Sequence, residues 1–313
     1  MAGNACFTHV SPTSLIRKIF SMSLQFVLMQ LFNGLILGSL YVLLALGLSI
    51  IFGMLGIINF AHGAFFMLGA YAAYTITSYI IPDFWVALIL VPVLMAMFGA
   101  LCEVVLFRRL YDLPSLYIML LTFGLMLVLQ DTARLLFGSM GVPFGTPKSL
   151  TGMVNLGFMY YPSYRLFLIA VTSLAAGAVW LFLIKTKLGC IIRAGTDNPR
   201  MLEALGVNIS KTMTLVVGLG TGLAGLAGVL AAPIQNVRPL MGMDLLVDCF
   251  VVVVIGGMGS LGGSVIGGLI VGQIIAIGVM VWPPMANTLI YLFMAAFLLV
   301  RPRGLFGREA FHE

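Results

Sequence analysis

The stretch that decides the fold is Lys185–Lys211, KTKLGCIIRAGTDNPRMLEALGVNISK, the longest charged segment of a 313-residue chain that is otherwise strongly apolar. Apolar runs long enough to cross a membrane flank it on both sides, at Arg165–Ile184 and Thr212–Ala232. A polar segment between two spans lies in water, and its five basic residues predict the cytoplasmic side.

The composition of the whole chain agrees with a membrane location. Hydrophobic residues make up 61% and charged residues 8%, whereas soluble domains carry about 25% charged residues. We predict an all-α polytopic integral membrane protein with about eight to nine transmembrane helices and two Gly-rich broken segments. The predicted apolar runs are Leu24–Phe52, Ala64–Ile81, Trp85–Phe107, Ser115–Phe137, Arg165–Ile184, Thr212–Ala232, Leu245–Val281 and Thr288–Val300.

Glycine-rich runs interrupt two of the apolar stretches, Gly56–Gly63 (GIINFAHG) and Gly256–Gly263 (GGMGSLGG). Each places a non-helical turn before a helix rich in glycine and alanine, an internal repeat of the kind that transporters carry near their substrate path. The alternative is two independent packing sites. If both broken segments are pairs of helices, there are nine spans; if one re-enters the membrane, there are eight.

A short helix is predicted inside the charged stretch, over Pro199–Leu205. Asp197 or Asn198 can cap its start, and Gly206 can end it with a positive φ. A helix this short is marginal on its own and needs a surface to pack against. That surface is either a cytoplasmic partner or the chain's own membrane domain. Three apolar side chains at helical spacing are predicted to form one stripe along it: Met201, Leu202 and Leu205.

Three motifs, in this order along the chain, carry a resemblance to a known family. They are Ile58–Tyr71 (INFAHGAFFMLGAY), Gly189–Asn208 (GCIIRA, nine residues, ALGVN) and Ile255–Gly263 (IGGMGSLGG). With the apolar runs around them, over roughly Met22 to Gly307, the chain resembles permeases of ABC importers of the branched-chain amino acid type, the LivH/LivM family.

The resemblance implies a multi-pass permease subunit of the inner membrane that is not an enzyme and has no cofactor. Its expected substrates are branched-chain or other hydrophobic amino acids, with urea or short amides as the alternative. Its expected partners are a second, homologous permease, two cytoplasmic ATPase subunits, an extracytoplasmic binding protein and membrane lipid. The alternative from another class is a stand-alone channel or an ion-coupled carrier.

The resemblance also places functional residues. The expected residues for coupling to the ATPase are Asp197, Asn198, Pro199, Met201, Ala204, Leu205 and Gly206. The broken segments suit a substrate path, because backbone groups freed at a helix break cannot face lipid, and helix ends can bind the two charges of an amino acid. The expected path residues are Asn59, His62, Gly63, Gln130, Gly257, Gly259 and Ser260.

The expected domain organisation is an N-terminal extension (residues 1–23), one permease domain (24–300, with 185–211 as the coupling loop) and a cytoplasmic tail (301–313). The distribution of charge supports this topology, because ten basic residues fall on the predicted inside and four on the outside. The four outside residues are Arg134, Lys148, Arg165 and Arg238.

Other functions are disfavoured by what the sequence carries. The run nearest to a nucleotide-binding P-loop has Pro147 where the motif requires glycine. The four cysteines and three histidines are scattered and indicate no metal site. The net charge of +6 is spread over short loops, which argues for topology signals rather than nucleic-acid binding.

Ionisable residues inside membrane spans are candidates for function. Glu103 is predicted to pair with Arg108 or with an adjacent loop, and Asp131 with Arg134, while Gln130 has no charge partner nearby in sequence. The two remaining acids, predicted to face water at an outer helix end, are Asp244 and Asp248.

Overall fold

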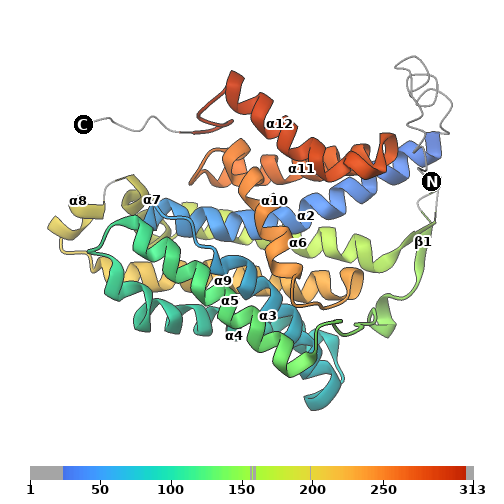
Figure 1. Cartoon of the computed structure of the whole chain (residues 1–313), viewed down its shortest axis with the longest axis horizontal. Helices are drawn as coiled ribbons and strands as arrows, with labels where there is room; N and C mark the ends of the chain where they lie inside the picture. The colour runs from blue at the N-terminus through green and yellow to red at the C-terminus, as the bar shows by residue number, and fades with distance from the viewer. Residues whose placement is uncertain (1–23, 156, 158–159, 198, 308–313) are drawn as a thin grey trace, which may run out of the picture.

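The computed structural model describes residues 24–155, 157, 160–197 and 199–307, and α-helices make up most of it (Figure 1). The expected N-terminal extension lies outside the described residues. The α-helices are α2 (Leu24–Leu55), α3 (Ala61–Thr75), α4 (Phe84–Val105), α5 (Ser115–Phe137), α6 (Ser163–Lys185), α7 (Lys187–Asp197), α8 (Pro199–Ala204), α9 (Ile209–Gln235), α10 (Met241–Gly256), α11 (Leu261–Val281) and α12 (Ala286–Val300).

Short elements join these helices. A π-helical turn, η1 (Ile76–Ile80), extends α3, and the remaining turns are the 3-10 helices η2 (Phe107–Leu110), η3 (Lys148–Leu150) and η4 (Pro283–Met285). The long loop before α6 holds a small antiparallel hairpin, β1 (Met153–Asn155) and β2 (Tyr160–Pro162), in which Val154 pairs with Tyr161. The sequence analysis did not predict this hairpin.

Seven helices of the described chain are long and apolar enough to cross a membrane, which confirms an all-α multi-pass protein. The limits of most spans follow the predicted apolar runs to within about three residues. The exceptions are Pro283–Val300, which begins five residues before the predicted Thr288, and the predicted run Leu245–Val281, which is divided into α10 and α11. The candidate spans are Phe26–Leu55, Phe84–Leu110, Ser115–Phe137, Ser163–Lys185, Ile209–Gln235, Leu261–Val281 and Pro283–Val300.

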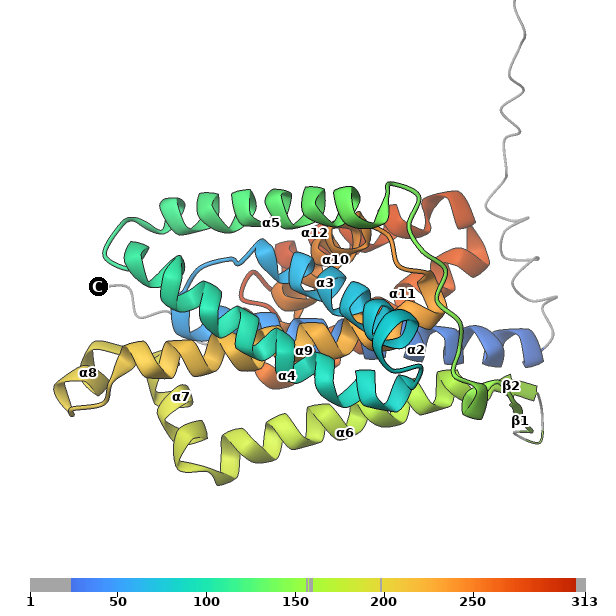
Figure 2. The ribbon, with the colours of Figure 1, turned by 90° about the horizontal axis from the view of Figure 1, so that it is seen from below.

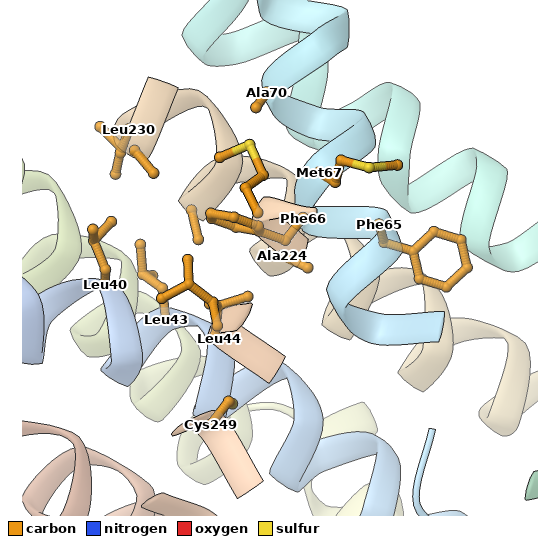
Figure 3. Close-up of a cluster of buried hydrophobic side chains, with 14 of the residues drawn as sticks. Leu40, Leu43, Leu44, Phe65, Phe66, Met67, Ala70, Ala224, Leu230 and Cys249 are labelled. Atoms are coloured by element: carbon orange, nitrogen blue, oxygen red, sulfur yellow. The ribbon is translucent and has the colours of Figure 1, made fainter. Parts of the chain in front are cut away.

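Helix α2 lies at the centre of the bundle, and beyond its exposed first turns its sequence is apolar on almost every side, as a buried helix requires. Figures 1 and 2 show the other long helices arranged around it. Figure 3 shows side chains from α2, α3, α9 and α10 meeting in one core. The labelled members are Leu40, Leu43, Leu44, Phe65, Phe66, Met67, Ala70, Ala224, Leu230 and Cys249.

Helices α2 and α11 touch through glycine. A Cβ atom added at Gly38 would lie 3.1 Å from the carbonyl oxygen of Gly268, and one added at Gly272 would meet the backbone nitrogen of Gly38. Gly34, one turn before Gly38, faces the same helix, because a Cβ there would lie 2.5 Å from the side-chain oxygen of Gln273. Contact between two helix backbones needs such small residues, because lipid provides no hydrophobic force that would press larger side chains together.

Helix α9 uses glycine toward three neighbours. A Cβ at Gly220 would lie 2.7 Å from a carbonyl oxygen of α2, one at Gly222 would lie 3.1 Å from a carbonyl oxygen of α4, and one at Gly228 would meet a carbonyl oxygen of α3. This glycine-rich span therefore approaches three neighbouring helices closely.

The two ends of the bundle differ in charge. One end, here called the loop end, carries α7 and α8; the opposite end, the hairpin end, carries β1 and β2 (Figure 1). The basic residues predicted to lie outside fall at or near the hairpin end, where Arg165 donates a hydrogen bond of 2.8 Å to Asn33 at the start of α2. The described basic residues at the loop end are Arg108, Arg109, Lys185, Lys187, Arg193, Lys211, Arg301 and Arg303.

We expect Gly272→Val to reduce the amount of folded protein, because its methyl groups would push α11 away from α2. Overpacking of this kind costs about 1–3 kcal/mol in a well-packed core. The matched control is Gly124→Val on α5, where no atom lies within 4 Å of the Cβ position. Size-exclusion yield and melting temperature in detergent measure the effect, and equal losses in the two variants would contradict the proposed helix contact.

Candidate functional site

The charged stretch folds into two helices, α7 and α8, at the loop end (Figure 1). Helix α8 is the predicted short helix and ends one residue earlier than predicted. Gly206 has a φ of +81°. Its N–H donates to the Glu203 carbonyl at 2.9 Å, and the Val207 N–H donates to the Leu202 carbonyl at 3.1 Å. This pair of bonds is a Schellman motif, so Gly206 ends the helix as predicted.

The prediction that the apolar side chains of α8 form one stripe was wrong, because they lie on two sides of the helix. Leu202 is buried against the protein, with 8% of its surface exposed. Met201 and Leu205 are 62% and 71% exposed, and Ala204 is exposed beside them. The helix therefore has one apolar anchor toward its own membrane domain and a second apolar surface that faces outward.

Helix α7 was missed by the sequence analysis. Its inward face is built from Gly189, Ile192 and Gly195, which recur every third residue and are buried. That spacing was the available signal, but two of the three residues are glycines, which are poor helix formers. Asp197, one of the two predicted caps, is the last residue of α7. The other, Asn198, lies outside the described residues, as do the side chains of Asp197, Pro199 and Arg200.

Helix α7 packs on the last turns of α2. A Cβ at Gly195 would lie 2.5 Å from the sulfur of Met54, and one at Gly53 would lie 2.9 Å from the side-chain methyl of Thr196. The same Cβ at Gly53 would lie 3.7 Å from the Cα of Gly259, in the segment between α10 and α11. The end of α2 is therefore a junction between the charged loop and both glycine-rich segments, and we call it the Gly53 junction.

The chain leaves α2 at Leu55 and starts α3 at Ala61. Gly56 has a φ of +65°, and Asn59 accepts a hydrogen bond of 3.0 Å on Oδ1 from the Ala61 N–H, which satisfies one group at the start of α3. The Asn59 side chain is buried, and its Nδ2 has no hydrogen-bond partner among the described residues.

His62, in the first turn of α3, is fully buried, and its Nε2 lies 3.1 Å from the carbonyl oxygen of Leu44 in α2. A carbonyl only accepts, so Nε2 carries the proton, and Nδ1 of the neutral ring is an acceptor. Within the described chain Nδ1 has no partner. The first segment thus holds one buried unpaired donor, on Asn59, and one buried unpaired acceptor, on His62.

Aromatic residues that the sequence analysis did not select surround this segment. Phe60 lies edge-on to Phe123 of α5 and to Phe250 of α10, with ring centroids 6.0 and 5.7 Å away. Its N–H donates to the hydroxyl of Thr122 in α5 at 3.3 Å. Gln130, a predicted path residue, is buried two turns further along α5. No sequence signal identified this group, because it depends on which helices are neighbours.

The second segment, between α10 and α11, is also capped. Gly257 and Gly259 have φ values of +98° and +78°. The hydroxyl of Ser260 accepts a hydrogen bond of 3.2 Å from the Gly263 N–H at the start of α11. The third predicted glycine, Gly63, lies in α3, where a Cβ would meet the carbonyl oxygen of Gly242 in α10.

The residues after α12 complete the second segment. The N–H groups of Leu305 and Phe306 donate to the carbonyls of Ile255 and Gly256, at 2.8 and 3.1 Å. These carbonyls are at the end of α10, where a helix leaves such groups without an internal partner. Gly257 faces this tail, because a Cβ there would lie 2.6 Å from the Gly307 nitrogen. The sequence analysis did not predict this contact.

Six of the seven predicted path residues lie in two groups, and the seventh, Gln130, lies on α5. Asn59, His62 and Gly63 sit together at the start of α3, and Gly257, Gly259 and Ser260 sit together before α11. The Gly53 junction connects the second group to the end of α2.

A protein-family comparison decides the class of this chain. The family described as the permease component of branched-chain amino acid transport systems matches residues 30–300. The chain belongs to this permease family.

Individual relatives agree. The chain is 30% identical to the high-affinity branched-chain amino acid transport system permease protein LivH of Salmonella typhimurium, over 92% of this chain and 98% of the relative. It is 29% identical to the permease protein BraD of Pseudomonas aeruginosa, over 90% and 96%. It is 26% identical to the permease protein LivM of Escherichia coli, over 71% and 57%. No solved structure matches the chain.

The protein is thus a multi-pass membrane permease, a transport component rather than an enzyme. LivH and LivM of Escherichia coli are both named as permease proteins of a high-affinity branched-chain amino acid transport system.

The permease carries one buried acid at its loop end, Glu103, with no exposed surface. Arg108 donates to it from Nη2 at 2.9 Å, which confirms the predicted pair. The hydroxyls of Thr214 and Tyr111 also donate to this carboxylate, at 2.6 and 3.1 Å. Burial and the nearby carboxylate raise the pKa of Tyr111 well above its ordinary value, so its hydroxyl stays protonated and remains a donor.

The other predicted acids have simpler surroundings. Asp131 pairs with Arg134 at 3.3 Å on the exposed face of α5, as predicted. Asp244 pairs with Arg238 at 3.3 Å on the surface. Asp248 does not simply face water, because the hydroxyls of two tyrosines donate to its carboxylate at 2.7 and 3.2 Å. These tyrosines are Tyr41 of α2 and Tyr291 of α12.

We expect Glu103→Ala to destabilise the permease by about 1–3 kcal/mol, because it leaves the hydroxyl of Tyr111 without its acceptor, while Arg108 is 36% exposed and can be solvated. The matched control is Asp131→Ala, which breaks an exposed pair worth about 0–1 kcal/mol. Melting temperatures in detergent compare the two. Equal shifts would show that the Glu103 cluster does not stabilise the loop end.

Proposed function

We propose that this permease is the membrane-spanning subunit of an ABC importer for branched-chain or other hydrophobic amino acids. The family and the names of the relatives support the substrate class. ATP would be hydrolysed by two separate cytoplasmic subunits, and a soluble binding protein would deliver the substrate at the hairpin end. A single permease domain, residues 24–300, would carry the path.

A second, homologous permease would complete the path. Escherichia coli has two different proteins, LivH and LivM, that are each named as a permease of a high-affinity branched-chain amino acid transport system. This chain is similar to both. We infer the same pairing here.

We also propose nine crossings of the membrane. Helix α3 has 15 residues and is extended by the five residues of η1, and α10 has 16 residues. At about 1.5 Å per residue, each of these two segments covers most of a hydrocarbon core about 30 Å thick. These two shorter spans and the seven long helices together would make nine. Each glycine-rich segment would then be the break beside one of the shorter spans.

The Gly53 junction is the observation that carries the coupling proposal. An ATPase would bind the exposed surface of α8, formed by Met201, Ala204 and Leu205. On its inner side, Leu202 lies close to Gly195 of α7, and α7 contacts the end of α2. A displacement of α8 would therefore reach both breaks through packed groups, which is the physical continuity that coupling needs.

We expect Leu205→Asp and Ala204→Arg to leave the permease folded but uncoupled, because both side chains are exposed here and would be buried against the ATPase. A charge left unpaired at a docking surface costs about 2–5 kcal/mol, which lowers stimulated ATP hydrolysis about tenfold or more. The control is Leu188→Asp, which places the same charge at the far end of the charged loop.

ATP hydrolysis stimulated by the loaded binding protein, measured in proteoliposomes, tests this. Normal stimulation in both α8 variants would exclude α8 as the coupling element.

The path proposal rests on the two unpaired buried atoms at the first break. A zwitterionic amino acid needs a donor for its carboxylate and an acceptor for its ammonium group, and Asn59 Nδ2 and His62 Nδ1 are one of each. Both are enclosed in the conformation described here. They would meet substrate when the helices around the break separate during the transport cycle.

We expect Asn59→Ser to keep the folded yield and lower transport. Serine retains an oxygen that can accept from the Ala61 N–H, but it lacks the amide donor. His62→Gln similarly retains a donor toward Leu44, but its amide oxygen does not occupy the position of the ring acceptor Nδ1. Uptake per correctly inserted permease separates transport from folding. Unchanged uptake per molecule in both variants would remove the two residues from the path.

A further inference from the structure

A groove of about 840 Å³ lies between α4, α6 and α9, on the side of the bundle away from α5. Figure 2 shows α9 between the other two helices. The volume lies within the range of sites that enclose a bound small molecule. Its walls are apolar and come from all three helices. They include Val93 and Met97 of α4, Ala178 and Phe182 of α6, and Leu219 and Leu223 of α9.

Charge is found at one end of the groove alone, the loop end. Lys211 and Thr214, in the first turns of α9, line it there, and none of the described lining residues is acidic. The Thr214 hydroxyl already bonds to Glu103 and Arg108, which neutralise each other. The ammonium group of Lys211 therefore provides the net charge at this end.

This polarity indicates what the groove holds. An occupant must be apolar along the depth of the membrane and negatively charged at the cytoplasmic surface. Anionic phospholipids of the cytoplasmic leaflet have this arrangement, and basic groups near that surface attract them. A helix of a partner protein would fill the apolar part but would have no requirement for a cation at one end.

We propose that the groove binds one anionic phospholipid of the cytoplasmic leaflet. The acyl chains lie along α4, α6 and α9, and the phosphate group lies beside Lys211. The bound lipid holds the start of α9, directly after the helix that we assign to coupling. The inference does not depend on the identity of the transported substrate.

The first experiment tests the charge with Lys211→Gln. The backbone bond from the Lys211 N–H to Asn208 at the start of α9 is retained, so the helix keeps its cap. Loss of one basic group near the membrane surface lowers affinity for an anionic lipid about fivefold. Lys187→Gln, in the same loop but outside the groove, is the control.

Purified permease is titrated with phosphatidylglycerol and with phosphatidylethanolamine, and the bound lipid is counted by native mass spectrometry. The expected result is tighter binding of phosphatidylglycerol by the unaltered permease and by Lys187→Gln, and a loss of this preference in Lys211→Gln. Equal binding of the two lipids by the unaltered permease would overturn the proposal.

The second experiment tests the groove itself. Ala178→Trp places a large ring among its lining residues, whereas Leu174→Trp, one turn earlier on α6, places the same ring on an exposed position outside it. We expect bound phospholipid to fall several-fold only in Ala178→Trp, and equal retention in the two variants would overturn the proposal. A cross-link from Ala178→Cys to a second permease subunit in the intact membrane would also overturn it, because a protein would then occupy the groove.

Discussion

The structure depends on the approach of helix backbones at positions without a side chain. In lipid, apolar side chains gain little by meeting each other, so contact must come from close packing. Helix α9 meets this constraint on three sides, since Gly220, Gly222 and Gly228 face α2, α4 and α3. Helix α2 meets it again toward α11. The packed centre holds the two glycine-rich segments in place, while α4, α5, α6 and α12 expose much of their apolar surface.

The two glycine-rich segments solve one problem in different ways. A helix that ends within the membrane domain leaves polar backbone groups, which cannot face lipid. At the start of α3, a side chain within the segment, Asn59, supplies a partner. At the end of α10, the partners are the N–H groups of Leu305 and Phe306, which follow α12. The first segment is closed by a side chain of its own, whereas the second, besides its local Ser260 cap, is closed at the end of α10 by residues distant in sequence.

The sequence predicted those features whose causes are local. Apolar length placed the long helices, Gly206 marked the end of α8, and Glu103 was near enough to Arg108 in sequence for the pair to be expected. Other features depend on which helices become neighbours, and no local pattern records that. The aromatic group around Phe60, the tail on α10 and the Gly53 junction are of this kind. Helix α7 was missed for another reason: its glycines, which allow close contact with α6 at Gly189 and with α2 at Gly195, lower its intrinsic preference for a helix.

The tail on α10 has a consequence for how the permease is made. During synthesis, α10 leaves the ribosome before α11 and α12, and the residues that satisfy its last carbonyls follow both. Domains form from the N-terminus as the chain grows, at roughly 5–20 residues per second. The second segment therefore stays open until the final helix has been inserted. The last carbonyls of α10 are therefore satisfied only after all the membrane helices have been made. A chain truncated before Leu305 lacks these partners, and its α10 ends with unsatisfied carbonyls at the loop end.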